Sequence, residues 1–153
     1  MLYELLCDLP WSPADADRIE WSDWLCRYVQ ARYGNVSNPN VSEAWLLLAR
    51  SIYGCPADNV SQGCRESVFC ARPSLDVEWV SSWAETVDYY EPDSVIRAAR
   101  LMVEAAADMQ ANANFRYDLV DITRQAVAER ARLVYNEIVA AYKAHDRKMF
   151  RHS

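Results

Sequence analysis

Two carboxylates near the start of the longest helical pattern are the first candidates for chemistry. Asp118 and Asp121 stand three residues apart in Tyr-Asp-Leu-Val-Asp-Ile-Thr-Arg124, so on a helix they share one face. Paired carboxylates can act as general acid and base, or as metal ligands. Alternatively, they interact with basic side chains or backbone N–H groups near a helix start. We favour this structural interpretation, because both effects are common where a helix begins.

Aromatic residues outside the regular helical patterns are a second candidate, in this case for a binding site. Aromatic rings in loops often stack on sugar rings, while polar edges orient the hydroxyl groups. The alternative for each ring is that it packs the core where helices and loop meet. The set comprises Tyr3, Trp11, Trp79, Trp83, Tyr89 and Tyr90.

The remaining polar side chains are weaker candidates for a functional site. Arg72, in Arg-Pro-Ser-Leu75, could bind a carboxylate or sugar, although an ion pair that braces the surrounding loop is the more ordinary role. The two histidines, His145 and His152, both sit near the carboxyl end, so no Ser–His–Asp or Cys–His arrangement is indicated. No C-x-x-C pair occurs either. We therefore predict neither a metal site nor a cofactor.

The cysteines leave two interpretations open. Three of the five cluster in one polar stretch, where a loop disulfide would form if the protein is exported. Cys7 and Cys26 stand among apolar residues and are expected to be small buried hydrophobes. The alternative is that every cysteine is reduced. The clustered residues are Cys55, Cys64 and Cys70.

Composition bounds the fold and the partners. The chain has 153 residues, 52% of them hydrophobic, and a formal net charge of −6. An acidic chain without a basic block is a poor nucleic-acid binder, and no apolar run approaches the ~20 residues of a membrane span. Only three glycines occur, which excludes a Gly-rich phosphate loop and argues against a turn-rich β fold.

Helical periodicity predicts an all-α fold, a bundle or array of four or more helices. We expect helices from Ser22, as N-cap, to Gly34; from Asn38-Pro39 to Gly54; from Pro92 to Met109; and from Phe115 to Lys148. Residues 55 to about 90 are predicted to be one long irregular loop. The expected core faces include Ala31, Val103 and Val127, whereas Glu129 is expected on a polar face.

The first residues, Met1-Leu-Tyr-Glu-Leu-Leu-Cys7, are apolar at once and lack the charged region of a signal peptide. They have the pattern of the middle of a folded element. We therefore expect that the chain begins part-way through a longer protein.

A set of ordered motifs resembles the family 89 glycoside hydrolases, the α-N-acetylglucosaminidases. The longest is Phe115-Arg-Tyr-Asp-Leu-Val-Asp-Ile-Thr-Arg-Gln-Ala-Val127. The others are Met1-Leu-Tyr-Glu-Leu-Leu with Trp11, Ala31-Arg-Tyr-Gly34, Ala44-Trp-Leu-Leu-Leu48, Ser51-Ile-Tyr-Gly-Cys55 and Arg72-Pro-Ser-Leu75. The resemblance covers nearly the whole chain except about residues 76–88.

The resemblance implies an exo-acting, retaining enzyme that removes terminal α-linked N-acetylglucosamine from glycans such as heparan sulfate. Such enzymes are lysosomal in animals and typically exported in bacteria. They combine a (β/α)8-type barrel with an all-α C-terminal domain. By this alignment, residues 1–20 come from the end of the barrel and a linker, and residues 21–153 are the first part of the helical domain, packed on the barrel.

Individual roles also follow from the resemblance. Tyr3 matches a tyrosine that lines the sugar pocket, and Cys55 and Cys64 match a disulfide-bonded pair. Neither catalytic glutamate is present, and Glu4 does not match one, so we expect the chain alone to be inactive. Two rivals are a stand-alone helical interaction module and a small enzyme that uses Asp118 and Asp121; the second requires both carboxylates to face an open pocket.

Overall fold

The computed structural model describes residues 2–8, 20–34, 38–55, 67–80 and 89–151. Over these residues the chain is all-α, which confirms the predicted fold class. The helices are α1 (Leu2–Asp8), α2 (Trp21–Tyr33), α3 (Pro39–Arg50), α4 (Pro92–Glu104), α5 (Ala106–Met109), α6 (Ala113–Lys143) and α7 (Arg147–Phe150). The described part of the predicted loop is irregular apart from one short 3₁₀ turn, η3 (Val68–Cys70).

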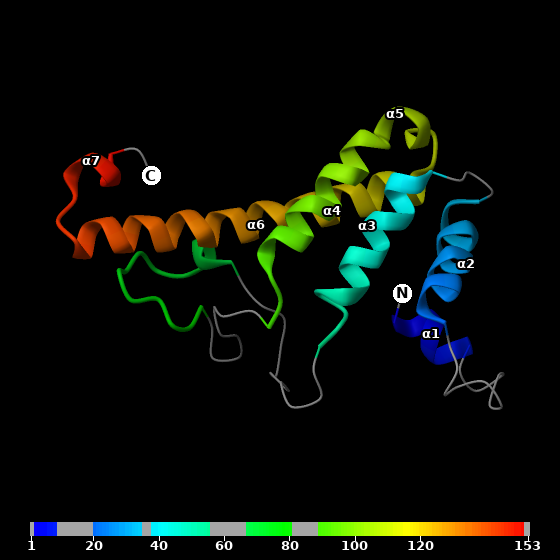
Figure 1. The fold of residues 1–153 in the computed structure, drawn as a ribbon, viewed down its shortest axis with the longest axis horizontal. Coiled ribbons are helices and arrows are strands. Elements are labelled where there is room, and N and C mark those ends of the chain that lie inside the picture. Colours follow the sequence, from blue (N-terminus) through cyan, green and yellow to red (C-terminus); the bar gives the residue numbers. More distant parts are fainter. Residues whose placement is uncertain (1, 9–19, 35–37, 56–66, 81–88, 152–153) are drawn as a thin grey trace.

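The arrangement is built around α4, which packs against both α3 and α6. Figure 1 shows α6 running along the length of the molecule, with α2 to α5 gathered over its amino-terminal half. The carboxyl-terminal half of α6 is accompanied by η3 and the segment around it, and by α7. The main core therefore lies at one end of the long helix.

Aromatic rings fill the side of this core between α2 and α3. Trp24 stacks on Tyr28 with ring centroids 5.6 Å apart, and Tyr28 meets Trp45 edge-on at 5.0 Å. Such paired rings add stability beyond the area that they bury. On the other side, the buried face of α4 consists of Val95, Ala98, Ala99 and Met102. The small alanines allow α4 to approach its neighbours closely.

The predicted start of α2 is wrong by two residues. The N-cap is Glu20, which makes no side-chain capping bond, and Ser22 lies inside the first turn. The end is confirmed: Gly34 has a φ of 79°, a region that favours glycine. One predicted core position is also wrong, because Ala31 is exposed and Tyr33 is buried instead.

The start of α3 follows the prediction, since the Asn38 side chain accepts a hydrogen bond from the Asn40 N–H at 3.0 Å. The helix ends at Arg50 rather than at Gly54. The backbone leaves the helical conformation at Ser51, which has a φ of −108° and a ψ of −95°. The Tyr53 N–H then bonds to Leu48 O at 3.1 Å and occupies an acceptor that the end of the helix leaves open.

The third predicted helix is two helices, α4 and α5, that meet at Ala105. The fourth, α6, begins at an Asn112 cap whose side chain accepts from the Phe115 N–H at 3.0 Å. It ends at Lys143 instead of continuing to Lys148. His145 has a φ of 54°, and Asp146 then caps α7. The turn that separates α6 from α7 therefore divides a pattern that looked continuous.

Candidate functional site

The segment that carries Tyr3 is α1, at the foot of α2 (Figure 1). The Trp24 indole N–H donates to the Asp8 carboxylate at 2.9 Å, and Leu5 packs against the core. Two contacts of different kinds thus attach α1 to the helical core. The backbone of Tyr3 is held within this attached helix; the position of its side chain lies outside what the structure describes.

The predicted carboxylate pair does not form one site. Asp118 is buried, whereas Asp121 is exposed and pairs with Arg124 of its own helix at 3.0 Å. Although three residues separate them, the first faces α2 and the second faces solvent. The structural interpretation of Asp118 is confirmed, and the geometry does not provide the open pocket that a small acid–base enzyme would require.

Asp118 is the centre of a hydrogen-bond network between α2 and α6. The Arg32 guanidinium donates to both carboxylate oxygens, at 2.5 and 2.6 Å, and the Tyr33 hydroxyl donates to one of them at 2.6 Å. Tyr33 also accepts from the Trp45 indole N–H at 2.9 Å, which brings α3 into the network. Bidentate arginine–carboxylate pairs are among the strongest and most directional contacts in proteins.

The network changes the titration of its members. The hydrogen bonds from Arg32 to Asp118 raise the pKa of the guanidinium further above its ordinary value. Burial, assisted by the hydrogen bond to Asp118, raises the pKa of the Tyr33 phenol. Both shifts favour the protonated forms of Arg32 and Tyr33, which are the forms that donate these hydrogen bonds.

A second buried carboxylate, Glu129, was missed by sequence reasoning. It was predicted on a polar face of α6, yet it is 3% exposed. The Tyr90 hydroxyl and the Gln125 amide donate to one of its oxygens at 2.7 and 2.8 Å, and Arg132 binds the other at 3.3 Å. The only signal for it in the sequence is Gln125 and Arg132 at helical spacing; Tyr90 lies 39 residues away. Glu129 attaches residues 89–90 to α6.

The aromatic candidates separate into different environments. Tyr89 and Tyr90 pack edge-on with ring centroids 5.2 Å apart, and the Tyr89 hydroxyl donates to Ile52 O, so both contribute to packing as the alternative proposed. They also line a polar cavity of about 410 Å³ between the end of α3 and the start of α4. Trp79 is exposed, whereas Trp11 and Trp83 lie outside the described residues.

The remaining predicted groups are on the surface. Arg72 is exposed and forms no ion pair with the residues that the structure describes. Cys7 and Cys26 are exposed, so the prediction of buried thiols is wrong: Cys26 lies on the outer face of α2, opposite the buried stripe. Cys55 is also exposed, but Cys64 lies outside the described residues, and the bridge between them stays a prediction.

Among the residues that the structure describes, no group of three or more His, Cys, Asp or Glu side chains could hold a metal ion. No helix in the same residues is both long and apolar enough to cross a membrane.

Comparison with known proteins gives matches along nearly the whole chain. Residues 24–153 match the family described as the alpha-N-acetylglucosaminidase (NAGLU) C-terminal domain. Human alpha-N-acetylglucosaminidase is 35% identical over 142 residues, which is 93% of this chain and 18% of the human protein.

Solved structures of family 89 glycoside hydrolases also match the chain. A family 89 glycoside hydrolase from Clostridium perfringens, in complex with 2-acetamido-1,2-dideoxynojirmycin, matches with a TM-score of 0.83 and 27% identity over 98% of this chain and 16% of its own. The enzyme CpGH89 from the same organism, in complex with its substrate GlcNAc-alpha-1,4-galactose, matches with a TM-score of 0.82 and 28% identity over 97% of this chain. The chain thus spans less than a fifth of the length of these relatives. It belongs to the family of α-N-acetylglucosaminidase C-terminal domains, the helical domain of the family 89 glycoside hydrolases.

Proposed function

We propose that the chain acts as part of an exo-acting, retaining α-N-acetylglucosaminidase and supports the sugar pocket of that enzyme. One observation carries the proposal. The chain superposes along 97% of its length on an enzyme described in complex with its substrate GlcNAc-alpha-1,4-galactose. In this proposal the two catalytic glutamates come from the rest of the protein, and the chain by itself does not hydrolyse the glycosidic bond.

The attachment of α1 to the helical core supports an assignment of the chain to two parts of the enzyme. Residues 1–20 would belong to the end of the catalytic barrel and its linker, and residues 21–153 to the helical domain packed on that barrel. The hydrogen bond from Trp24 to Asp8 then joins the two parts. A pocket wall built on α1 is positioned by α2, because Leu5 and Asp8 both contact the helical core.

The use of the buried carboxylates agrees with a supporting role. Asp118 accepts three hydrogen bonds and Glu129 accepts three, all from side chains of this chain. Their oxygens are thereby committed to holding α2, α6 and residues 89–90 in place. A general acid or base must instead reach the substrate directly or through one water molecule.

We also propose the substrate class and the place of action. The substrate is a glycan with terminal α-linked N-acetylglucosamine, such as heparan sulfate, and the enzyme is lysosomal in a eukaryote or exported in a bacterium. Both statements rest on the family. A panel of reducing-end-labelled oligosaccharides with terminal α- or β-linked N-acetylglucosamine tests the first, since only the α-linked series should lose one sugar.

Tyr3 provides the direct test of the pocket-supporting role. In the full-length enzyme, Tyr3→Ala should lower kcat/KM for p-nitrophenyl α-N-acetylglucosaminide by roughly 10–1000-fold, on the order of 1.4–4 kcal/mol. Tyr3→Phe should be mild, because it keeps the apolar ring and removes only a hydroxyl. The reason is that a phenol in a pocket wall orients the sugar without transferring a proton.

The control is Asp121→Asn, an exposed change on α6 that should leave both kinetics and melting temperature unchanged. If Tyr3 only packs the junction between barrel and helices, Tyr3→Ala will lower the melting temperature and leave kcat/KM near normal below it. That result would remove Tyr3 from the pocket.

A further inference from the structure

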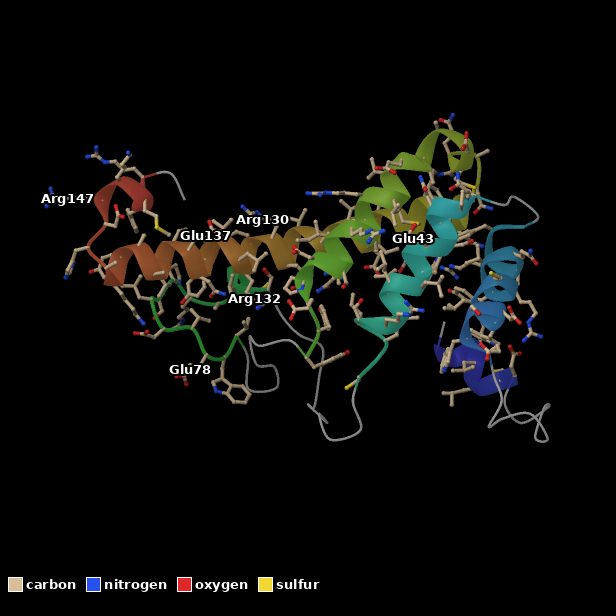
Figure 2. All side chains as sticks on the ribbon, viewed as in Figure 1. Glu43, Glu78, Arg130, Arg132, Glu137 and Arg147 are labelled. Atoms are coloured by element: carbon tan, nitrogen blue, oxygen red, sulfur yellow. The ribbon has the colours of Figure 1, made fainter. Side chains whose placement is uncertain are left out.

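The helix α1 touches the helical core along one narrow face. Leu5 packs against the core, and Asp8, one turn further on, accepts the Trp24 indole N–H at 2.9 Å. Between these two positions, Leu6 and Cys7 are exposed. Figure 2 shows side chains between α1 and the foot of α2, the helix that carries Trp24. Two contacts therefore decide how α1 lies on the described part of the helical domain.

The two contacts of α1 fix different aspects of its position. Apolar packing is not directional, so Leu5 holds α1 against the core and still allows the helix to turn about its own axis. A hydrogen bond to a carboxylate is directional, because the acceptor oxygen must lie close to the line of the N–H bond. The bond between Asp8 and Trp24 therefore sets the rotation of α1.

The donor in this bond is held rigidly by the aromatic core. Trp24 is only 4% exposed. Its ring stacks on Tyr28 with centroids 5.6 Å apart, and Trp21 meets it edge-on at 6.4 Å. Tyr28 packs in turn against Trp45 of α3. The place of the indole N–H is thus determined by α2 and α3, so the helical domain positions α1 and not the reverse.

Residue 3 occupies the opposite side of α1 from these anchors. A helix has about 3.6 residues per turn, so the Cα atom of residue 3 lies across the helix axis from those of Leu5 and Asp8. A rotation that draws Asp8 away from Trp24 moves residue 3 by a similar distance in the opposite direction. The geometry of the bond to Trp24 is thereby linked to the geometry at residue 3.

We propose that Trp24 is a positioning residue for the hydrolysis of terminal α-linked N-acetylglucosamine. Acting through Asp8, its indole N–H sets the rotation of α1 and so the place of Tyr3 in the wall of the sugar pocket. This inference rests on the proposed function, because it requires Tyr3 in that wall. It adds that the aromatic core of α2 and α3 determines how well the pocket fits the sugar.

Variants of Asp8 in the full-length enzyme test the proposal. Asp8→Ala removes the acceptor and should lower kcat/KM for p-nitrophenyl α-N-acetylglucosaminide by roughly 10-fold well below the melting temperature, because a small displacement of an orienting group costs about this much. Asp8→Asn keeps an oxygen that can accept the bond and should retain most of the activity. Asp23→Ala, which removes an exposed carboxylate from α2, is the matched control and should have native kinetics.

A double-mutant cycle separates positioning from a purely structural role. In the Tyr3→Ala background, Asp8→Ala should cause no further loss of kcat/KM, because the residue that it positions is already gone. Trp24→Phe keeps a ring against Tyr28 and removes the N–H, so it should match Asp8→Ala. Combining Trp24→Phe with Asp8→Ala should add no loss to that of either single variant.

Three results would overturn the proposal while Tyr3→Ala remains impaired. Asp8→Ala could lower the melting temperature and leave kcat/KM native. It could lower kcat/KM by the same factor in both backgrounds, which would mean that it acts independently of residue 3. Asp8→Asn could be as impaired as Asp8→Ala, which would mean that the charge matters and the bond to Trp24 does not. Failure of the proposed function is distinct: Tyr3→Ala itself would keep a native kcat/KM, and the inference would fall with it.

Discussion

Asp118 is a single carboxylate that joins two helices distant in sequence. It lies 86 residues from Arg32 and 85 from Tyr33, and it accepts hydrogen bonds from both. Removing one partner of a buried charge pair is costly because the other charge remains in a poorly solvated place. In this network the charge left behind would be that of Arg32.

Asp118→Asn should therefore lower the free energy of unfolding by about 2–4 kcal/mol, below the largest known effects because Arg32 is partly exposed. The matched variant Asp121→Asn alters an exposed pair on the same helix and should change stability by less than about 0.5 kcal/mol. Urea denaturation of the three proteins measures both quantities. Equal losses from the two variants would mean that the Arg32 pair contributes no more than a surface contact.

Cys55 and Cys64 test a residue-scale feature that came only from the family resemblance. If they are bridged, protein from an oxidising host should show three titratable thiols after denaturation instead of five. The loop between them is short, so the bridge should stabilise the fold by about 2–3 kcal/mol at most.

Single variants identify which cysteines pair. Cys64→Ser should show four thiols, because its partner is released, whereas Cys70→Ser should show two. Five thiols in the native chain, with a melting temperature that does not respond to reductant, would contradict the bridge.

At the scale of elements, most helices could be predicted because their signals are local. The Asn38-Pro39 start of α3 and the Gly34 end of α2 need only neighbouring residues, and both were predicted correctly. The errors have other causes. The backbone leaves the helical conformation at Ser51, before the glycine that was expected to end α3, and Glu129 is buried because Tyr90 reaches it from a distant segment. Helical periodicity detects neither event.

Gly34 is the position where an element boundary depends on one backbone conformation. Its φ of 79° and ψ of −169° lie in a region that is open almost only to glycine, and a Cβ there would meet no atom within 4 Å. Gly34→Ala should thus cost about 1–3 kcal/mol of unfolding free energy from backbone strain alone. Chemical denaturation gives the value.

Gly34→Asn sharpens this test. Asparagine tolerates the ordinary left-handed helical region but not this extended one, so it should be no better than alanine. Full stability of either variant would mean that the end of α2 relaxes at no cost.

At the scale of the whole molecule, the candidate site could be predicted only in part. The resemblance led to the family, which the comparisons confirm. It also led to Tyr3, whose role in the pocket stays a prediction. The connection from α1 to the core through Asp8 and Trp24 spans 16 residues and has no periodic signal. Val103 and Val127 were predicted as core, but both are exposed, because a sequence shows which residues are apolar but not which of them are covered.

The core as a whole should be sensitive to alkaline pH. Burial raises the pKa of the Tyr28 and Tyr33 phenols above the value of about 10 that they have in an unfolded chain. With a raised pKa, the folded state retains protons that the unfolded state releases. The stabilisation is therefore complete below about pH 10 and is lost as the pH rises above it, by up to about 1.4 kcal/mol per pH unit for each phenol.

Two variants separate titration from hydrogen bonding. Tyr28→Phe should reduce the slope of unfolding free energy against pH between about 10 and 11.5, with little change at pH 7. Tyr33→Phe should reduce the same slope but also lower stability at pH 7, because Asp118 loses a donor and the Trp45 indole loses its acceptor. Denaturant titrations at each pH provide the values. Identical slopes in the native chain and in Tyr28→Phe would mean that this phenol ionises within the folded core, so that its burial does not oppose the charge.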